Sequence, residues 1–299
     1  VGCLNTCRPI CPTFFENRLM TVVAKTLNML DSILFMSEPW LMLERRQIVS
    51  EKFRQYARLA RVGLHIGEGL VLGAASGAIF FPHQPFQRPV IQFWQKRFCQ
   101  VMGLDITVHG RPDPRPALWV SNHVSWLDIP VIGSNFPVYF LSKAEVGNWP
   151  LVKHLAKAGG TLYIKRGSGD ANGVAEQISS HLNAQRSVLF FPEGTTTDGK
   201  QLKRFFHKLF QAAVMTGADI QPVVICYRDE HGDLHNVAPF IGDDEFTSHL
   251  LDVLKEKHIG VELMVLPRVS VEGRNERTLA KDLQAMMADA LLKLHQGKI

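Results

Sequence analysis

Cysteine is scarce in this sequence, and the five cysteines that it contains do not form a recognisable framework. Cys3, Cys7 and Cys11 are evenly spaced near its start, but no further cysteine or histidine pair completes the four-ligand set of a structural zinc ion. An odd number of cysteines also leaves at least one without a disulfide partner. We therefore expect free thiols in a reducing compartment and no metal site.

The sequence also lacks the motifs of several enzyme classes. It has no Gly-x-Ser-x-Gly elbow, which would present a nucleophilic serine, and no cysteine stands beside His123. Residues 167–169 (Gly-Ser-Gly) lack the third glycine and the helix entry of a dinucleotide-binding loop. We therefore expect neither a covalent enzyme intermediate nor a redox cofactor. No internal repeat, low-complexity segment or cleavable signal peptide is evident.

The composition is that of a globular protein with a basic surface. Of its 299 residues, 46% are hydrophobic and 20% are charged, which excludes intrinsic disorder. The mean hydropathy of +0.00 is high for a soluble enzyme and low for a protein that crosses the membrane many times. A net charge of +5 suits an anionic partner such as a lipid surface, a phosphorylated substrate or a nucleic acid.

The first 84 residues differ in character from the rest. Residues 19–43 have the pattern of an amphipathic helix, a basic segment runs from Arg45 to Arg61, and residues 62–81 are apolar. Five glycines of this apolar stretch fall within roughly 160° of a helical wheel, a smooth face that a second helix can approach closely. We expect residues 19–43 and 62–81 to form a helical hairpin that dips into one leaflet, with basic flanks on the cytoplasmic side. The alternative is a buried helix of a soluble bundle.

Prolines at positions 82, 85 and 89 mark the boundary of a second domain, residues 85–299. Here short apolar segments alternate with amphipathic ones, which predicts an α/β fold with a mostly parallel central sheet flanked by helices. The strands are expected at residues 105–109, 117–120, 138–141, 161–164, 188–191, 220–227 and 261–269. The helices are expected at residues 86–102, 147–158, 171–184, 203–216, 245–258 and 278–295.

A candidate catalytic pair follows the predicted strand at residues 117–120. His123 stands where this strand ends, and Asp128 stands at the expected start of a short helix. A turn between them can bring the carboxylate to the imidazole, where it fixes the tautomer and leaves the other ring nitrogen free to accept a proton from a hydroxyl. The five-residue spacing alone is weak, because such residues also serve as simple caps of a strand and a helix.

Four blocks in the same order resemble the glycerolipid acyltransferase family. Residues 122–128 (Asn-His-Val-Ser-Trp-Leu-Asp) resemble its His-x-x-x-x-Asp motif, and residues 191–195 (Phe-Pro-Glu-Gly-Thr) resemble its Pro-Glu-Gly motif. Residues 160–166 are similar to its arginine-bearing strand, and residues 221–225 to its last apolar motif. The resemblance covers roughly residues 85–270.

The resemblance implies roles for five further residues. Lys143 and Arg166 would bind an acceptor phosphate, and a guanidinium can do so in two-pronged fashion. Glu193, Gly194 and Thr195 would contribute to acceptor binding, although Gly194 also suits a turn that needs an unusual backbone angle. The family often has basic residues after the Pro-Glu-Gly-Thr core, whereas this chain has Thr-Thr-Asp-Gly at residues 196–199. This departure leaves the head group of the acceptor open.

The resemblance implies an O-acyltransferase. The missing metal and dinucleotide motifs imply that it needs no cofactor, and the basic flanks of the expected hairpin place it at the cytoplasmic face of a membrane. The acyl donor would be acyl-CoA or acyl carrier protein, and the leading acceptor a lysophospholipid, 1-acylglycerol-3-phosphate, which would yield phosphatidic acid. A lyso-ornithine lipid or another lysolipid is the alternative acceptor, and an inactive membrane-binding scaffold is the alternative function. A nucleic-acid partner is not expected, because the basic residues lack the interleaved aromatic residues of a stacking surface.

Overall fold

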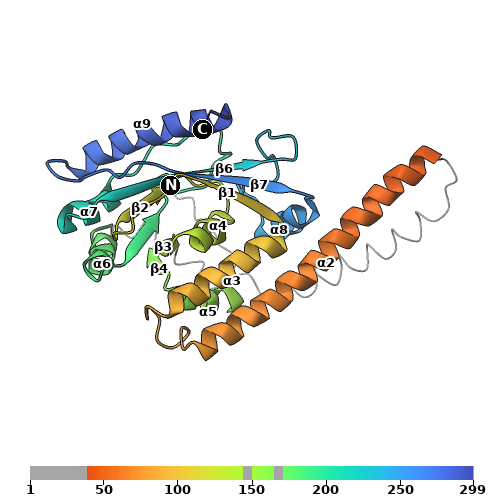
Figure 1. Ribbon diagram of the computed structural model, residues 1–299, viewed down its shortest axis with the longest axis horizontal. Helices are drawn as coiled ribbons and strands as arrows, with labels where there is room; N and C mark the ends of the chain where they lie inside the picture. Colours follow the sequence, from red (N-terminus) through yellow and green to blue (C-terminus); the bar gives the residue numbers. More distant parts are fainter. Residues whose placement is uncertain (1–38, 144–149, 165–170, 299) are drawn as a thin grey trace, which may run out of the picture. The chain divides into compact units, whose positions relative to one another are not determined.

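The computed structural model describes residues 39–143, 150–164 and 171–298 (Figure 1). Residues 54–299 form one compact unit, which is built around a seven-stranded sheet with the strand order β1-β7-β6-β2-β5-β3-β4. The strands are β1 (Leu104–His109), β2 (Leu118–Ser121), β3 (Val138–Lys143), β4 (Leu162–Ile164), β5 (Ser187–Phe190), β6 (Ile220–Arg228) and β7 (Ile259–Val265). Each predicted strand is present, with ends that differ by a few residues.

Five neighbouring strands of the sheet run in the same direction. β2 pairs in parallel with both β5 and β6, and β3 pairs in parallel with both β5 and β4. The two remaining strands, β7 and β1, are parallel to each other, and β7 is antiparallel to β6. The predicted mostly parallel sheet is therefore confirmed. The carboxyl ends of β6, β2, β5, β3 and β4 lie at one edge, where open α/β sheets bind their ligands.

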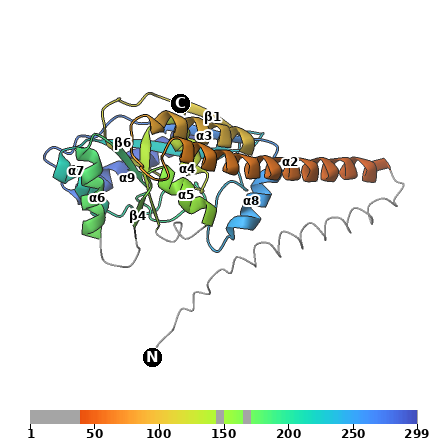
Figure 2. The same cartoon turned by 90° about the horizontal axis from the view of Figure 1, so that it is seen from below.

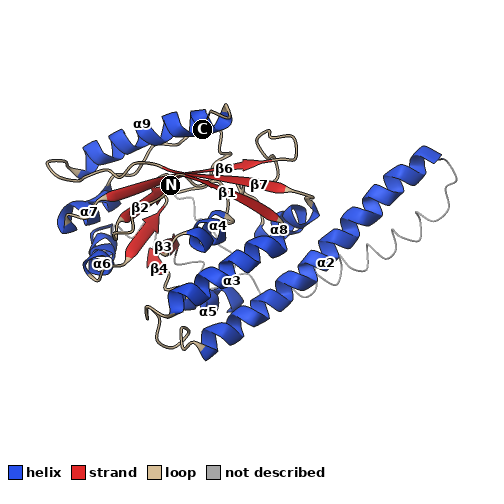
Figure 3. Ribbon diagram, in the orientation of Figure 1, coloured by secondary structure: helices blue, strands red, loops and turns tan. Residues whose placement is uncertain are grey.

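Helices cover both faces of this sheet (Figure 3). They are α2 (Pro39–Ala75), α3 (Gln87–Met102), α4 (Asp128–Asn135), α5 (Pro150–Ala158), α6 (Ala171–Asn183), α7 (Gln211–Thr216), α8 (Phe246–Lys255) and α9 (Glu276–His295), with a 3-10 turn η2 (Lys208–Phe210) before α7. Buried side chains of α6, α7 and α9 pack on one face, and those of α3, α4 and α8 pack on the other. Because successive side chains of a strand point to opposite faces, Val224 belongs to the first core and Ile225 to the second.

The described structure has a helical hairpin formed by α2 and α3, whereas the prediction paired residues 19–43 with residues 62–81. Residues 39–75 form one continuous helix, α2, so no turn separates the basic segment from the apolar stretch. After a turn, α3 runs back alongside the second half of α2 (Figures 1 and 2). His65 of α2 stacks on Trp94 of α3 with a centroid separation of 4.8 Å, and each donates from its ring to the other's backbone carbonyl. Most of the predicted helix at residues 19–43 lies outside the described residues.

The predicted extent of the apolar helix and its row of glycines are corrected, and two residues of the basic segment have contacts with α8. The helix ends at Ala75 rather than at residue 81, and Gly77 lies beyond it with a φ of 69°, so the five glycines do not form one helical face. Gly69 instead makes room for Trp94, whose ring would lie 2.5 Å from an added Cβ. In addition, Arg54 and Arg58 donate to the carbonyls of Lys255 and Glu256 at the C-terminal end of α8, where cations stabilise a helix. Among the described helices, none is both long and apolar enough to cross a membrane.

The predicted helix at residues 203–216 begins later than expected, at η2, because its first backbone N–H groups have partners elsewhere. The N–H of Lys203 donates to the carboxylate of Glu193, and that of Phe205 donates to the side chain of Gln284. The N–H of Phe206 donates to the carbonyl of Pro192 at 2.8 Å. Tertiary hydrogen bonds therefore hold residues 201–207 against the Pro-Glu-Gly segment in place of a helical turn.

Candidate active site

The candidate catalytic pair lies at the carboxyl edge of the sheet, where β2 ends. The Nδ1 atom of His123 is 2.7 Å from Oδ2 of Asp128, as the five-residue spacing predicted. The His123 side chain is 18% exposed and the Asp128 side chain is fully buried, so substrate can reach the imidazole but not the carboxylate. Asp128 is the first residue of α4, where a negative charge is favoured by the helix dipole.

Four donors surround the Asp128 carboxylate. Oδ2 accepts from the backbone N–H groups of Val124 and Ser125 at 2.8 and 3.1 Å and also faces the His123 ring, while Oδ1 accepts from the Tyr227 hydroxyl at 2.7 Å. An ionised carboxylate offers acceptor sites alone, and two of these partners are backbone N–H groups, which can only donate. His123 Nδ1 therefore carries the proton. Its Nε2 atom is left with a lone pair, as a general base requires.

Glu193 ties the segment after β5 to the catalytic loop. It is 2% exposed, and its carboxylate accepts from the backbone N–H of His123 at 2.9 Å and from that of Lys203 at 2.7 Å. Burial raises the pKa of Glu193, and the two backbone hydrogen bonds oppose that shift. Both carboxylate oxygens therefore accept hydrogen bonds from backbone N–H groups. The predicted contact of Glu193 with the acceptor stays a prediction.

Further contacts fix the ring and backbone of His123. Its imidazole stacks on Phe191 with a centroid separation of 3.8 Å and an interplanar angle of 10°. Its carbonyl accepts from the backbone N–H of Thr197 at 2.8 Å. On its other side, the buried amide of Asn122 both donates to and accepts from the backbone of Ile225 in β6. The histidine is therefore held by segments from three strands.

Gly194 adopts the left-handed backbone that the sequence suggested, with a φ of 67°. An added Cβ would lie 3.0 Å from the ring of Phe206, so both the angle and the space favour glycine. Thr195 follows with an exposed side chain. Its predicted role in acceptor binding also stays a prediction.

The two predicted phosphate ligands are only partly placed. Lys143 is the last residue of β3, and its backbone therefore lies at the same sheet edge as His123 and Glu193, while its side chain is not among the described ones. Arg166 lies outside the described residues. It follows β4, the parallel neighbour of β3, by two positions.

Sequence reasoning missed three residues of this cluster, namely Tyr227, Asn122 and Phe191. Asn122 and Phe191 belong to the recognised motifs, so their positions were marked although their contacts were not. Tyr227 lies 99 positions after Asp128 and belongs to no local motif. The one clue in the sequence was its position, since it is a polar side chain near the end of the strand that carries the last apolar block.

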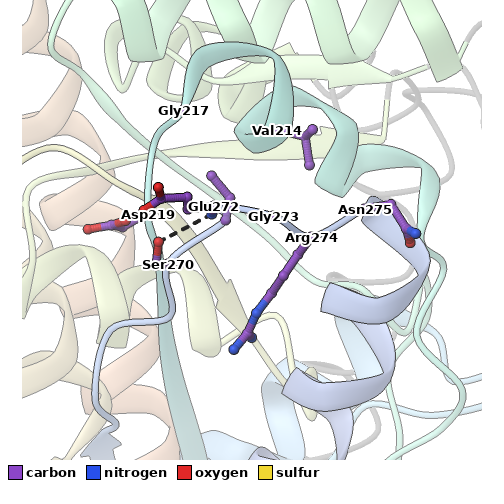
Figure 4. A pocket seen from close by; sticks show the side chains of 9 residues that line it. Val214, Gly217, Asp219, Ser270, Glu272, Gly273, Arg274 and Asn275 are labelled. Carbon is purple, nitrogen blue, oxygen red and sulfur yellow. Dashed lines mark hydrogen bonds between the residues drawn. The ribbon is translucent and has the colours of Figure 1, made fainter.

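A cavity of about 790 Å³ lies elsewhere, at the opposite edge of the sheet near the start of β6 (Figure 4). It is lined by Asp219 and by residues 270–275, and the N–H of Glu272 donates to Ser270 Oγ at 3.2 Å. The His123–Asp128 pair and the residues that hold it do not line this cavity. The candidate site is therefore the carboxyl edge, where a histidine is positioned by a buried carboxylate.

Comparison with known proteins identifies related chains. The Acyltransferase family model matches residues 105–226. A lyso-ornithine lipid O-acyltransferase of Pseudomonas aeruginosa is 40% identical over 207 residues, a match that spans 69% of this chain and 80% of that protein. A 1-acyl-sn-glycerol-3-phosphate acyltransferase of Neisseria meningitidis is 29% identical over 197 residues, which span 63% of this chain and 76% of that protein.

The fold is shared with a solved structure. The crystal structure of the 1-acyl-sn-glycerophosphate acyltransferase PlsC from Thermotoga maritima has a TM-score of 0.62 and 18% sequence identity, and the match covers 83% of this chain and 97% of that one. This structural likeness shows the shared α/β fold, and the evolutionary relationship to the family rests on the sequence matches. The chain belongs to the glycerolipid acyltransferase family.

Proposed function

We propose that this protein is an O-acyltransferase that transfers a fatty acyl group from a thioester donor to the free hydroxyl of a lyso-ornithine lipid. The observation that carries the choice of acceptor is the 40% identity to a lyso-ornithine lipid O-acyltransferase, against 29% to a 1-acyl-sn-glycerol-3-phosphate acyltransferase. The second candidate acceptor is 1-acylglycerol-3-phosphate. It is favoured by the latter relative and by the four motifs.

The segment after the Pro-Glu-Gly motif supports an acceptor without a phosphate monoester. Residues 196–199 carry no basic side chain, and two of them have structural partners instead. Thr197 bonds to the carbonyl of His123, and Asp198 accepts from the backbone N–H of Lys200 at 3.0 Å. A phosphate monoester carries nearly two negative charges, so several converging cations bind it tightly. The head group of an amino acid lipid is zwitterionic and needs fewer cations.

The geometry of His123 supports a direct transfer. In the proposed step, Nε2 of His123 removes the proton of the acceptor hydroxyl, and the resulting alkoxide attacks the thioester carbonyl carbon. The C–S bond then breaks, and the departing thiolate receives the proton from the imidazolium. Asp128 stabilises the imidazolium throughout and does not itself take the proton. No covalent enzyme intermediate and no cofactor are needed.

The tetrahedral intermediate needs hydrogen-bond donors for its oxyanion. The N–H groups of Val124 and Ser125 are engaged by Asp128, so they do not serve. The backbone N–H groups of Thr195 and Thr196 follow the left-handed Gly194, and neither donates to another group within the described part of the chain. We assign the oxyanion to these two groups. This gives the Thr195 position a role through its backbone.

The decisive experiment is an assay of the purified protein on both acceptors, with acyl-CoA and acyl carrier protein tested in parallel as donors. We expect a higher kcat/KM for the lyso-ornithine lipid than for lysophosphatidic acid. A preference for lysophosphatidic acid would overturn the proposed acceptor and leave the acyltransferase assignment standing. Absence of transfer to every lysolipid would overturn the proposed function itself.

Lys143 and Arg166 provide a second test of the acceptor. If lysophosphatidic acid is the substrate, Lys143→Met or Arg166→Met should weaken the kcat/KM for that acceptor by about 2–5 kcal/mol, the effect of leaving a desolvated charge without its partner. The loss on a lyso-ornithine lipid should be much smaller. If neither substitution changes kcat/KM for either acceptor, these cations lie outside the acceptor pocket.

We further propose that the protein works at the cytoplasmic surface of a membrane, which it contacts through α2 and the turn before α3. The support is a set of exposed apolar side chains in this region, among them Phe80 and Phe81, which are 64% and 72% exposed, together with Leu64 and Val71. Apolar side chains gathered in this way commonly mark a membrane or partner contact. Liposome flotation should therefore weaken in a Phe80→Ser, Phe81→Ser double variant. Leu292→Ser, which alters an exposed leucine of α9, is the matched control, and equal flotation of all three proteins would contradict the placement.

A further inference from the structure

Tyr227 stands where β6 extends past its neighbour. The last residue of β2 that pairs with β6 is Ser121, opposite Val223, whereas β6 continues to Arg228. On the side of β2, the extra residues of β6 therefore lie beside the catalytic loop, while on their other side they pair with β7. Asn122 fills the place of the missing strand, because its side-chain amide accepts from the N–H of Ile225 at 2.8 Å and donates to the carbonyl of the same residue at 2.9 Å.

This anchor determines the direction in which Tyr227 points. Two residues after Ile225, the side chain of Tyr227 returns to the same face of the sheet, the face that α4 covers. Asp128 begins α4, and the Tyr227 hydroxyl meets its Oδ1 atom at 2.7 Å. The ring of Tyr227 and the carboxylate of Asp128 are both buried, so solvent does not compete for this hydrogen bond.

We propose, resting on the proposed function, that Tyr227 is a positioning residue that acts on His123 through Asp128. Its hydroxyl holds the Oδ1 atom, so that Oδ2 is aimed at the histidine ring and the carboxylate cannot rotate about its last bond. Without Tyr227, Oδ1 would be a buried acceptor with no partner among the described residues, and only the backbone N–H groups of Val124 and Ser125 would oppose rotation of the carboxylate. Tyr227 does not contact the reacting atoms.

The electrostatic surroundings keep this phenol a donor. Burial raises the pKa of Tyr227 well above its ordinary value, and the negative charge of Asp128 raises it further. The ionisable groups around the pair, within the described residues, are Glu193 beside the histidine backbone and the thiols of Cys99 and Cys226 beside the tyrosine. Burial raises the pKa of both thiols, to about 12 for Cys99 and about 11 for Cys226, so neither adds a charge near neutral pH.

The first test is the pH–rate profile of Tyr227→Phe, which removes the hydroxyl and keeps the ring. On the plateau, kcat should fall about tenfold, the size expected for one lost hydrogen bond to a charged group, with the KM values of both substrates unchanged. The acidic limb should move to higher pH by at least about 0.5 unit, because a carboxylate relieved of its phenol donor holds the imidazolium more strongly. Tyr139→Phe is the matched control, since this buried tyrosine of β3 contacts His83 and His181 instead.

A double-mutant cycle separates positioning from simple structural support. If Tyr227 acts through Asp128, then adding Tyr227→Phe to Asp128→Asn should change kcat by less than about twofold. A full tenfold loss in that background, or an acidic limb that stays in place while only thermal stability falls, would overturn the proposal. Site-specific 3-fluorotyrosine at position 227, a stronger donor, covers the case in which Tyr227→Phe does not fold. It should move the limb to lower pH, and an unmoved limb would overturn the proposal.

One measurement does not depend on activity. The nitrogen chemical shifts of the His123 imidazole should report a proton on Nδ1 in the wild-type protein, and in Tyr227→Phe the Nδ1 nitrogen and its proton should shift toward the values of a stronger hydrogen bond to the carboxylate. Identical shifts in the two proteins would contradict the role of Tyr227. By contrast, a wild-type protein with the predicted tautomer and no acyl transfer would contradict the proposed function.

Discussion

Replacing Glu193 with glutamine distinguishes the two roles that this residue can have. The wild-type carboxylate accepts from two backbone N–H groups, those of His123 and Lys203. A glutamine presents one oxygen and one NH₂ group, so whichever way it turns, a donor faces a donor. The buried site then loses one hydrogen bond to a charged group and keeps an N–H without a partner.

The expected loss in the free energy of unfolding follows from these contacts. A lost hydrogen bond to a charged group costs about 1.5–3 kcal/mol, and an unsatisfied buried donor adds to this figure. Because burial raises the pKa of Glu193, removing its charge recovers part of the loss. We therefore expect Glu193→Gln to be about 1–3 kcal/mol less stable than the wild-type protein. Since the His123 backbone loses its anchor, kcat should fall about tenfold with the acceptor KM unchanged.

Urea unfolding and steady-state kinetics on the same protein preparation provide the assay. Glu272→Gln is the matched control, because Glu272 is exposed and its carboxylate makes no hydrogen bond or ion pair with a described residue. The control should match the wild-type protein in both measurements. Unchanged stability of Glu193→Gln together with a raised acceptor KM would refute the reasoning, and would show instead that Glu193 binds the acceptor.

Three other substitutions test separate parts of the structure. Gly194→Ala should lower the free energy of unfolding by about 1–3 kcal/mol, because the position combines a positive φ with contact to Phe206. Gly242→Ala is the control, since Gly242 has a φ of 62° with open space around it, and it should lower the free energy of unfolding by less. Equal losses in the two variants would contradict the steric argument. Asn122→Ala should lower stability by about 2–4 kcal/mol and lower kcat, because both bonds to Ile225 are buried; wild-type urea unfolding and turnover would contradict this. Burial, followed by the charges of neighbouring His83 and Arg186, lowers the pKa of His181 to about 4, so the native state binds fewer protons than the unfolded chain between about pH 4 and 6.5. Wild-type stability should therefore rise with pH across that window by about 1–3 kcal/mol, and urea unfolding of His181→Asn at several pH values should show a flatter dependence; an unchanged slope would contradict the assignment.

The sequence allowed most of the α/β unit to be predicted because its patterns are local. Apolar strands bounded by turns marked the sheet, and the motif around His123 predicted a histidine in contact with a carboxylate, a contact that the structure shows at 2.7 Å. The late start of the helix at residue 208 was not predictable in this way. It depends on N–H groups of Lys203 and Phe206 that bond to Glu193 and Pro192 once the chain has folded.

The N-terminal hairpin illustrates a different limit. A row of glycines predicted a smooth helical face, but one glycine accommodates Trp94 and another follows the helix in a turn. Periodicity identifies the faces of a helix and not the partner that covers them. Tyr227 is the corresponding case in the active site, because its contact with Asp128 depends on the register between β6 and β2, which no short motif encodes.

The central claim is that His123, oriented by Asp128, is the general base of acyl transfer to a lysolipid hydroxyl. The most direct measurement is the turnover of purified His123→Ala with a labelled acyl donor and a lyso-ornithine lipid, compared with wild type after both proteins are shown to have the same fold. We predict that kcat falls by at least about 10²-fold. Turnover of folded His123→Ala near that of wild type would contradict the mechanism.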